Sequence, residues 1–345
     1  MAGQESHLTV AVVGAGVIGL SCAHDIAKAG HQVVVIHADE SNGRVSEVAA
    51  AMWFPYRTEE SAASLSWSRK GFERFSELAN DPDTGVDMVA GMVVERLPGS
   101  RAWTKALSEY RVADADELPP DALSGTKTVV PVVTTSIYLA WLREECERLG
   151  VFFVSATLDS MAAVENSMGS SPDVVVVAAG LQSAALLKDD EESYPIRGQV
   201  VRLANPGIAE WTLDDDNPQG VTYIVPRRDD VVCGGSTEVG SWERAYDPEL
   251  EAAILRRVRA LAPALEGQPI LSRAVGLRPG RPSVRLEEVS GHPWPVVACY
   301  GHGGAGITLS WGSAEEVTSI IEGIGNDGAK GGRSQVWEQM IKREP

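Results

Sequence analysis

The chain has 345 residues, with 30 Lys and Arg against 48 Asp and Glu, so its formal net charge is -18. Nucleic acids and anionic membranes bind basic surfaces, so this charge argues against both as partners. The four cysteines are widely separated with no metal-binding spacing, and the N-terminal segment lacks a basic region followed by an apolar one. We therefore expect a cytoplasmic protein with no metal site, no signal peptide and no transmembrane segment.

The N-terminal segment predicts a strand, a turn, a helix and a second strand. Residues 8–16 (LTVAVVGAG) and 31–40 (HQVVVIHADE) are apolar runs typical of buried parallel strands. Residues 17–30 between them have apolar side chains at helical spacing. This order is the beginning of a doubly wound, Rossmann-type sheet.

The rest of the chain alternates between two kinds of pattern. Short apolar runs with polar turns at 85–133, 194–203 and 221–237 predict strands of a second, antiparallel sheet. Residues 171–180 (SPDVVVVAAG) and 293–301 (PWPVVACYG) predict further buried strands of the first sheet. Helices are expected at 61–78, 136–150, 248–265 and 307–325, the third of them capped by Asp247 with Pro248 at its first position.

This alternation predicts an α/β fold in which a Rossmann-type domain is interleaved with a smaller β-rich (α+β) substrate domain. We assign residues 1–58, 137–192 and 274–325 to the first domain, which would bind the cofactor. Residues 59–136 and 193–273 would form the substrate and interface domain, and the Gly- and Lys-containing residues 326–345 a mobile tail.

The first turn carries a dinucleotide-binding pattern. Gly14, Gly16 and Gly19 form GxGxxG between the first strand and the first helix, where the backbone can approach a pyrophosphate at the helix N-terminus. Asp39 follows the second strand, where an acidic side chain would bind a ribose hydroxyl. These features do not distinguish NAD from FAD.

A glycine-rich turn near the other end of the chain favours a flavin. Residues 299–314 (CYGHGGAGITLSWGSA) place Gly301, Gly303, Gly304 and Gly306 directly before a predicted helix. Several exposed N–H groups and the positive end of the helix dipole would stabilise a reduced, anionic flavin. An NAD-dependent dehydrogenase would leave this turn without a purpose.

From Val10 to Val317 the sequence resembles the D-amino-acid oxidase family of FAD enzymes. The segments that carry the resemblance are GAGVIGLSCA (14–23), VAAAMWFPY (48–56), VVVVAAG (174–180), RGQVV (197–201), YIVPR (223–227), CGGST (233–237), VGLRPGRPSVRLE (275–287) and YGHGGAGITLSWGSA (300–314). The last two are the most specific. The resemblance implies a Rossmann-type FAD-binding domain and a non-covalent, extended FAD.

It also implies which residues hold the cofactor. They are Gly14, Ala15, Gly16, Val17, Ile18, Gly19, Asp39, Arg44, Val45, Ser46, Ala51, Met52, Leu158, Ala179, Gly180, Arg278, Gly303, Gly304, Ala305, Gly306, Ile307 and Thr308. Ala51 and Met52 would contact the flavin ring through the backbone, and Gly304 to Thr308 its pyrimidine edge.

For catalysis the resemblance points to Arg278, Tyr223 and Gly304. The Arg278 fork would bind the substrate α-carboxylate, the Tyr223 hydroxyl would reach the same group, and the Gly304 carbonyl would accept from the amine. Arg281 and Arg285, in the same short segment, are expected to form structural salt bridges instead. The walls of the substrate pocket would be Phe54, Tyr56, Leu213 and Thr237. His302 is a tempting base, but the implied chemistry needs none.

One position departs from the family pattern. Thr237 stands where some relatives have a second tyrosine and D-aspartate oxidases tend to have an arginine, which disfavours acidic substrates. Glu238 beside it raises the hypothesis that a basic substrate side chain is attracted instead.

The implied function is FAD-dependent oxidative deamination of D-amino acids with neutral side chains, basic ones being an open extension. Hydride would pass from Cα to flavin N5, and dioxygen would reoxidise the flavin. The products are 2-oxo acids, ammonia and hydrogen peroxide. Alternatives are glycine, sarcosine or D-aspartate oxidation on the same scaffold, or a non-catalytic nucleotide-binding redox sensor. The expected partners are small molecules, and a homodimer is left open beside a monomer.

Overall fold

Six strands form the first sheet of the molecule. The computed structural model describes residues 7–38, 44–56 and 59–327. The strands run in the order β14-β15-β7-β1-β2-β6, of which only the edge strand β14 is antiparallel to its neighbour. Their bounds are β1 (Thr9–Val13), β2 (Gln32–His37), β6 (Phe152–Ser155), β7 (Val174–Val177), β14 (Arg285–Val289) and β15 (Val296–Tyr300).

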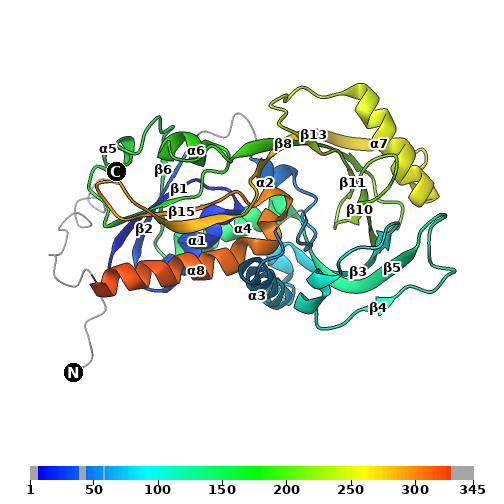
Figure 1. Cartoon of the computed structure of the whole chain (residues 1–345), viewed down its shortest axis with the longest axis horizontal. Coiled ribbons are helices and arrows are strands. Elements are labelled where there is room, and N and C mark those ends of the chain that lie inside the picture. Colours follow the sequence, from blue (N-terminus) through cyan, green and yellow to red (C-terminus); the bar gives the residue numbers. More distant parts are fainter. Residues whose placement is uncertain (1–6, 39–43, 57–58, 328–345) are drawn as a thin grey trace.

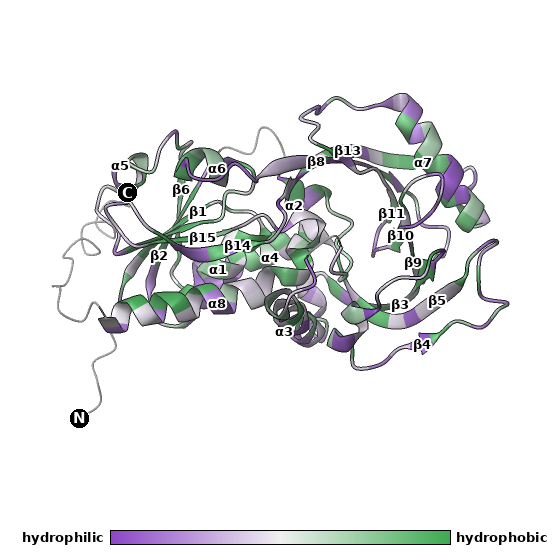
Figure 2. Cartoon of the chain, viewed as in Figure 1, coloured by the Kyte–Doolittle hydropathy of each residue, from purple (hydrophilic) through white to green (hydrophobic). Residues whose placement is uncertain are grey.

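Helices cover both faces of this sheet. On one face lie α1 (Val17–Lys28), α4 (Thr135–Arg148) and α8 (Gly306–Asp327), and on the other α5 (Ala163–Met168) and α6 (Gln182–Leu187) (Figure 1). Because neighbouring strand residues point to opposite faces, Val10 and Val12 pack with α1 and α8, whereas Ala11 and Val13 pack with α5 and α6. Both faces are buried, which explains the continuous apolar runs of these strands (Figure 2).

Nine strands form the second sheet, which is mostly antiparallel. Its order is β12-β8-β11-β10-β9-β3-β5-β4, and β13 pairs with β8. The bounds are β3 (Val86–Glu95), β4 (Arg111–Val112), β5 (Ser124–Val133), β8 (Tyr194–Leu203), β9 (Trp211–Asp214), β10 (Thr222–Pro226), β11 (Val231–Gly234), β12 (Glu238–Val239) and β13 (Ile270–Gly280). Since β13 belongs to this sheet as far as Gly280, the segment boundary expected at residue 274 falls inside a strand. The other boundaries remain predictions.

Two capped helices flank the second sheet. α3 (Ala62–Leu78) begins after Ser61, whose hydroxyl accepts from the Ser64 backbone in a capping box. α7 (Pro248–Leu261) begins after Asp247, whose carboxylate accepts from two backbone N–H groups of the first turn, as the sequence predicts. The apolar face of α7 packs on β8, β10 and β11.

The chain passes repeatedly between the two sheets. Figure 1 shows β8 and β13 leading from the first sheet into the second, and β5 runs straight into α4 of the first. None of the described helices is long and apolar enough to cross a membrane. α8 continues to Asp327, past the start predicted for the tail, and residues 328–345 lie outside the described part.

Candidate functional site

A cavity of about 890 Å³ is lined by residues of both sheets. Most of the predicted cofactor and substrate residues line it: Gly14, Ala15, Gly16, Val17, Ile18, Arg44, Val45, Ser46, Ala51, Met52, Phe54, Tyr56, Leu158, Ala179, Gly180, Leu213, Tyr223, Arg278, Gly303, Gly304, Gly306 and Ile307. Segments far apart in the sequence thus share one site. Gly19, Thr237, Ala305 and Thr308 are absent from the lining, and Asp39 lies outside the described residues.

The β1–α1 turn presents backbone groups to the cavity. Gly16 is the N-cap of α1 and no side chain caps the helix, although the Val17 N–H donates to Ser46 Oγ at 3.1 Å. A Cβ on Gly19 would overlap the Gly14 carbonyl, so glycine here lets α1 pack directly against the turn. Gly19 is therefore a packing residue rather than a lining one.

Ala51 has a strained backbone at the cavity wall. Its φ is +58°, in the left-handed region that side chains disfavour. The conformation is held by the surrounding structure, since the Val133 N–H donates to the Ala51 carbonyl at 2.9 Å. Strain of this kind concentrates at functional sites, and here it turns the Ala51–Met52 backbone toward the cavity.

A glycine turn precedes α8 on the other side of the cavity. Gly303 has φ +53° and, with Gly304 and Ala305, forms a short 3-10 helix that leads into α8. The Thr308 hydroxyl accepts from the Phe54 N–H at 3.0 Å and donates to the Phe54 carbonyl at 2.9 Å. Thr308 thus fixes the segment that carries Phe54.

These features fit an extended dinucleotide. The uncapped N-terminus of α1 suits a pyrophosphate, with Arg44 on the same wall. The cavity continues from there past Ala51 to the glycine turn before α8, whose N-terminus suits negative charge on a flavin. The residues present therefore match the cofactor that the sequence predicts.

Arg278 lies over a glycine of the neighbouring strand. A Cβ on Gly198 of β8 would overlap the Arg278 guanidinium, so glycine makes room for this side chain on the sheet. Nη1 donates to the Ser236 carbonyl at 3.1 Å, and among the described residues no carboxylate pairs with the guanidinium. The fork is held by a neutral group and its charge is left for an anionic ligand.

Tyr223 of β10 lies against a glycine turn. A Cβ on Gly234 or Gly235 would collide with its ring, and Arg257 of α7 holds that turn through a bond from Nη2 to the Gly235 carbonyl at 2.7 Å. Burial raises the pKa of Tyr223, opposed by the charge of Arg278. The phenol is therefore a neutral donor at physiological pH, suited to a carboxylate.

Tyr56 connects the two sides of the substrate region. Its hydroxyl lies 3.1 Å from Thr237 Oγ1, and its ring covers Gly304, where a Cβ would press on the ring. Phe54 packs edge to face on Trp103 at 5.1 Å. Leu213 lies on β9 directly opposite Tyr223. These residues line a mainly apolar pocket next to Arg278, with Thr237 behind Tyr56.

The other arginines of the 275–287 segment are structural, as predicted. Arg281 pairs with Asp190 at 3.2 Å and Glu192 at 2.6 Å, and Arg285 with Asp189 and Glu287, both at 2.7 Å. Tyr300, which Arg285 also contacts, has its pKa raised to about 12 by burial.

Two further polar residues have structural partners. His302 is buried with Nε2 3.0 Å from Ser313 Oγ, although it lines the cavity. The Glu238 carboxylate pairs with Arg197 at 2.6 Å, which neutralises the charge that was to attract a basic substrate. The structure thus removes the physical reason for that hypothesis.

Sequence reasoning missed the glycines beneath the candidate substrate-binding side chains Arg278 and Tyr223, and one arginine. Gly198 and Gly234 stand in the RGQVV and CGGST segments, but only the strand register shows that they lie under Arg278 and Tyr223. Arg244 lines the cavity from the loop after β12 and has no motif to mark it.

Comparison with known proteins assigns the fold and the family. A family described as FAD dependent oxidoreductase matches residues 9–320. A D-amino-acid oxidase of Rubrobacter xylanophilus is 43% identical over 90% of this chain and 94% of its own length, and a human D-aspartate oxidase is 31% identical with the same coverage.

Solved structures agree at the level of the fold. Glycine oxidase from Geobacillus kaustophilus superposes with a TM-score of 0.76 at 18% identity, covering 91% of this chain and 95% of that one. The predicted resemblance, α/β fold and FAD cofactor are confirmed. The chain belongs to the FAD dependent oxidoreductase family.

Proposed function

We propose that the protein oxidises D-amino acids with neutral side chains to 2-oxo acids, ammonia and hydrogen peroxide. The observation that carries the proposal is a half-buried Tyr223 beside Arg278, with no acidic partner among the described residues, in the cavity that is also lined by the turns expected to bind the cofactor. The similarity of this chain to the D-amino-acid oxidase of Rubrobacter xylanophilus supports the same activity.

Arg278 and Tyr223 bind and orient the substrate in this proposal. The guanidinium and the phenol both donate to the α-carboxylate, and the Gly304 carbonyl accepts from the amine. With the side chain in the apolar pocket, the single Cα hydrogen of the D-enantiomer faces the flavin side, and that of the L-enantiomer does not. The apolar walls from Phe54 and Leu213 take an uncharged side chain and exclude water. When bound, FAD supplies the acceptor for the hydride from Cα.

No side chain is required as a base in this scheme. His302 is held by Ser313, and Tyr223 keeps its proton. The rate therefore comes from orientation and from the electrostatic environment of the two helix N-termini.

The remaining partners are part of the same proposal. Dioxygen is the expected final electron acceptor, which accounts for hydrogen peroxide. A cytoplasmic location is supported by four buried, unpaired cysteines. Exposed Met88 and Val129, which share one face of neighbouring strands of the second sheet, support a homodimer, which sedimentation would test.

The first experiment is anaerobic titration of the purified holoenzyme, followed by its visible spectrum. D-Alanine and D-methionine are expected to bleach the flavin, and L-alanine is expected to leave it oxidised. A yellow protein that no D-amino acid bleaches would overturn the substrate assignment while leaving the cofactor assignment intact.

A further inference from the structure

The cavity has a one-sided charge distribution. Three arginines, Arg44, Arg244 and Arg278, line it, and no Asp or Glu appears among its described lining residues. The chain as a whole carries 48 acidic residues against 30 basic ones, so this distribution is opposite to that of the molecule. A cavity of this kind is built for anions.

Two of these arginines already have an anion assigned to them. Arg44 stands on the wall of the cofactor turn with the pyrophosphate as its expected ligand, and Arg278 stands in the substrate region for the α-carboxylate. Arg244 has no assignment. It is exposed, and within residues 7–38, 44–56 and 59–327 it has neither a hydrogen bond nor an ion pair.

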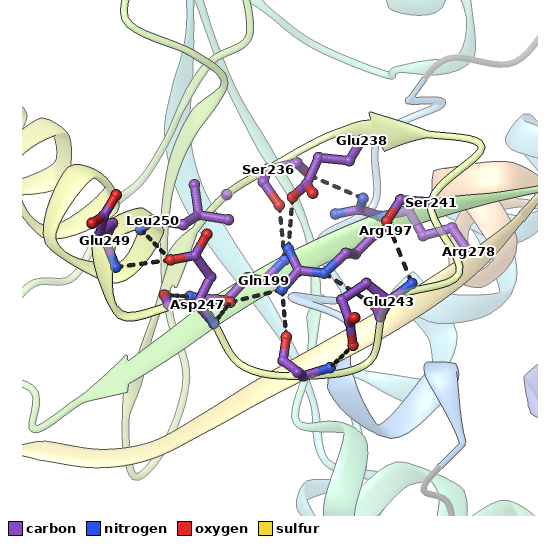
Figure 3. Close-up of polar contacts among 12 residues, drawn as sticks. Arg197, Gln199, Ser236, Glu238, Ser241, Glu243, Asp247, Glu249, Leu250 and Arg278 are labelled. Atoms are coloured by element: carbon purple, nitrogen blue, oxygen red, sulfur yellow. Dashed lines mark hydrogen bonds and ion pairs between the residues drawn. The ribbon is translucent and has the colours of Figure 1, made fainter.

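The loop that carries Arg244 is fixed on both sides of this residue. Arg197 of β8, 2% exposed, donates from Nε to the Glu243 carbonyl at 3.1 Å and from Nη2 to the Ala245 carbonyl at 2.7 Å. Figure 3 shows the loop curving around the Arg197 guanidinium, with Gln199 beside it. The Glu243 carboxylate also accepts from the Ala245 N–H at 2.6 Å.

This arrangement fixes the backbone on both sides of Arg244 without using the Arg244 side chain, and Arg244 lines the cavity. Burying the Arg197 guanidinium costs free energy. Its hydrogen bonds to the two backbone carbonyls, to the Glu238 carboxylate and to the Gln199 side chain offset this cost. The same strand places Gly198, over which Arg278 lies, next to Arg197 in the sequence. Because consecutive strand residues face opposite sides of the sheet, β8 holds the Arg244 loop on one face and makes room for Arg278 on the other.

Resting on the proposed function, we propose that Arg244 binds the side-chain carboxylate of dicarboxylic D-amino acids, so that D-glutamate and D-aspartate are substrates beside the neutral ones. Arg278 then takes the α-carboxylate, and the apolar walls cover the methylene groups between the two charges. The expectation that acidic substrates are disfavoured rests only on Thr237, which stands where D-aspartate oxidases tend to have an arginine. Arg244 supplies the cation from a different position in the chain.

The test compares Arg244→Gln with the wild-type holoenzyme on D-glutamate, D-aspartate and D-methionine. Loss of a charge-assisted bond should lower kcat/KM for the better acidic substrate by about 10- to 100-fold and change that for D-methionine by less than about threefold. Arg148→Gln is the matched control, because it removes the same charge from an exposed site on α4 and should change neither value.

A binding measurement separates recognition from turnover. The flavin spectrum reports binding of 2-oxo acids. Arg244→Gln should weaken the binding of 2-oxoglutarate by a similar factor and leave the binding of 2-oxobutyrate unchanged, and Arg244→Lys should have an intermediate affinity for 2-oxoglutarate. Equal losses for both ligand classes, or no loss for the acidic one, would overturn the role of Arg244.

The two proposals fail in different ways. If the wild type oxidises D-methionine but neither acidic substrate, the Arg244 inference is wrong and the proposed function stands. If it oxidises none of the three, the proposed function itself is wrong.

Discussion

The cavity has two regions that are lined by different kinds of group, backbone in one and side chains in the other. The cofactor region consists mainly of backbone, at the β1–α1 turn, the Ala51 segment and the glycine turn before α8. The substrate region consists of side chains, chiefly Arg278, Tyr223 and Tyr56. A backbone site needs small residues at fixed local positions, whereas a side-chain site needs long-range packing to aim each group.

This difference implies that a substitution in one region can impair that region's ligand binding and leave the other region intact. A change in the cofactor region should remove FAD and with it stability, because the bound ligand stabilises the folded state. A change in the substrate region should leave a yellow, folded protein with altered kinetics. Three measurements test this separation, and a fourth tests buried thiols that lie outside both regions.

The largest effect is expected from Gly19→Ala. The new Cβ would overlap the Gly14 carbonyl and force α1 away from the turn, at a cost of about 1–3 kcal/mol or more. The protein should lose most of its absorbance in the flavin band and melt at a lower temperature. Gly323→Ala is the matched control, since its Cβ meets open space on α8, and it should retain full flavin content. Retained FAD in Gly19→Ala would contradict the packing role.

Arg278→Lys should leave FAD bound and nearly abolish turnover. An ammonium cannot make the two parallel bonds of the guanidinium fork, so kcat/KM should fall by about 100-fold or more. Arg281→Lys, in the same segment but paired with Asp190 and Glu192, should stay within about twofold of the wild type. Equal losses in the two variants would show that the segment, rather than Arg278, matters.

Tyr56→Phe should have a smaller effect. It removes one neutral hydrogen bond to Thr237, worth about 0.5–1.5 kcal/mol, or about 2- to 10-fold in kcat/KM. Thr237→Val removes the other partner of the same bond, so the double variant should be no worse than the worse single one. Additive losses would mean that the two hydroxyls act independently.

The smallest effect concerns two buried thiols outside the cavity, Cys146 on α4 and Cys233 on β11, and it is expected only at alkaline pH. Burial raises the pKa of Cys146 and of Cys233 to about 12 from the usual 9.0. Because the folded-state pKa is the higher one, this stabilisation is complete below pH 9 and is lost as the pH rises through about 12. The free energy of unfolding should therefore fall across this window, and fall less in Cys146→Ala and Cys233→Ala. An identical alkaline decline in all three proteins would contradict this.

The sequence predicts the backbone-built region well because its requirements are local. Gly14 and Gly19 are close in the chain, and strand, turn and helix follow one another. The cap of α7 at Asp247 is local in the same sense. Asp39 lies outside the described residues, and the contacts of the other residues with the cofactor stay predictions.

The sequence predicts less of the side-chain region because its contacts cross the fold. Tyr56 and Thr237 meet across 181 positions of the chain, and Gly198 lies under Arg278 only through the register of β8 and β13. Arg244 belongs to an irregular loop, and its place at the cavity depends on Arg197 holding the flanking carbonyls. No periodic pattern encodes such a position.

The chain order of the cofactor region also affects how the protein is made. The Gly14 turn leaves the ribosome early, whereas the turn at Gly303–Ala305 follows every described strand and precedes only α8. A nascent chain can therefore pre-form the pyrophosphate side during translation, but it can close around the flavin only when synthesis of the folded part is almost finished. Flavin binding would thereby report that the described fold has been synthesised, and products truncated before α8 should accumulate as colourless apoprotein.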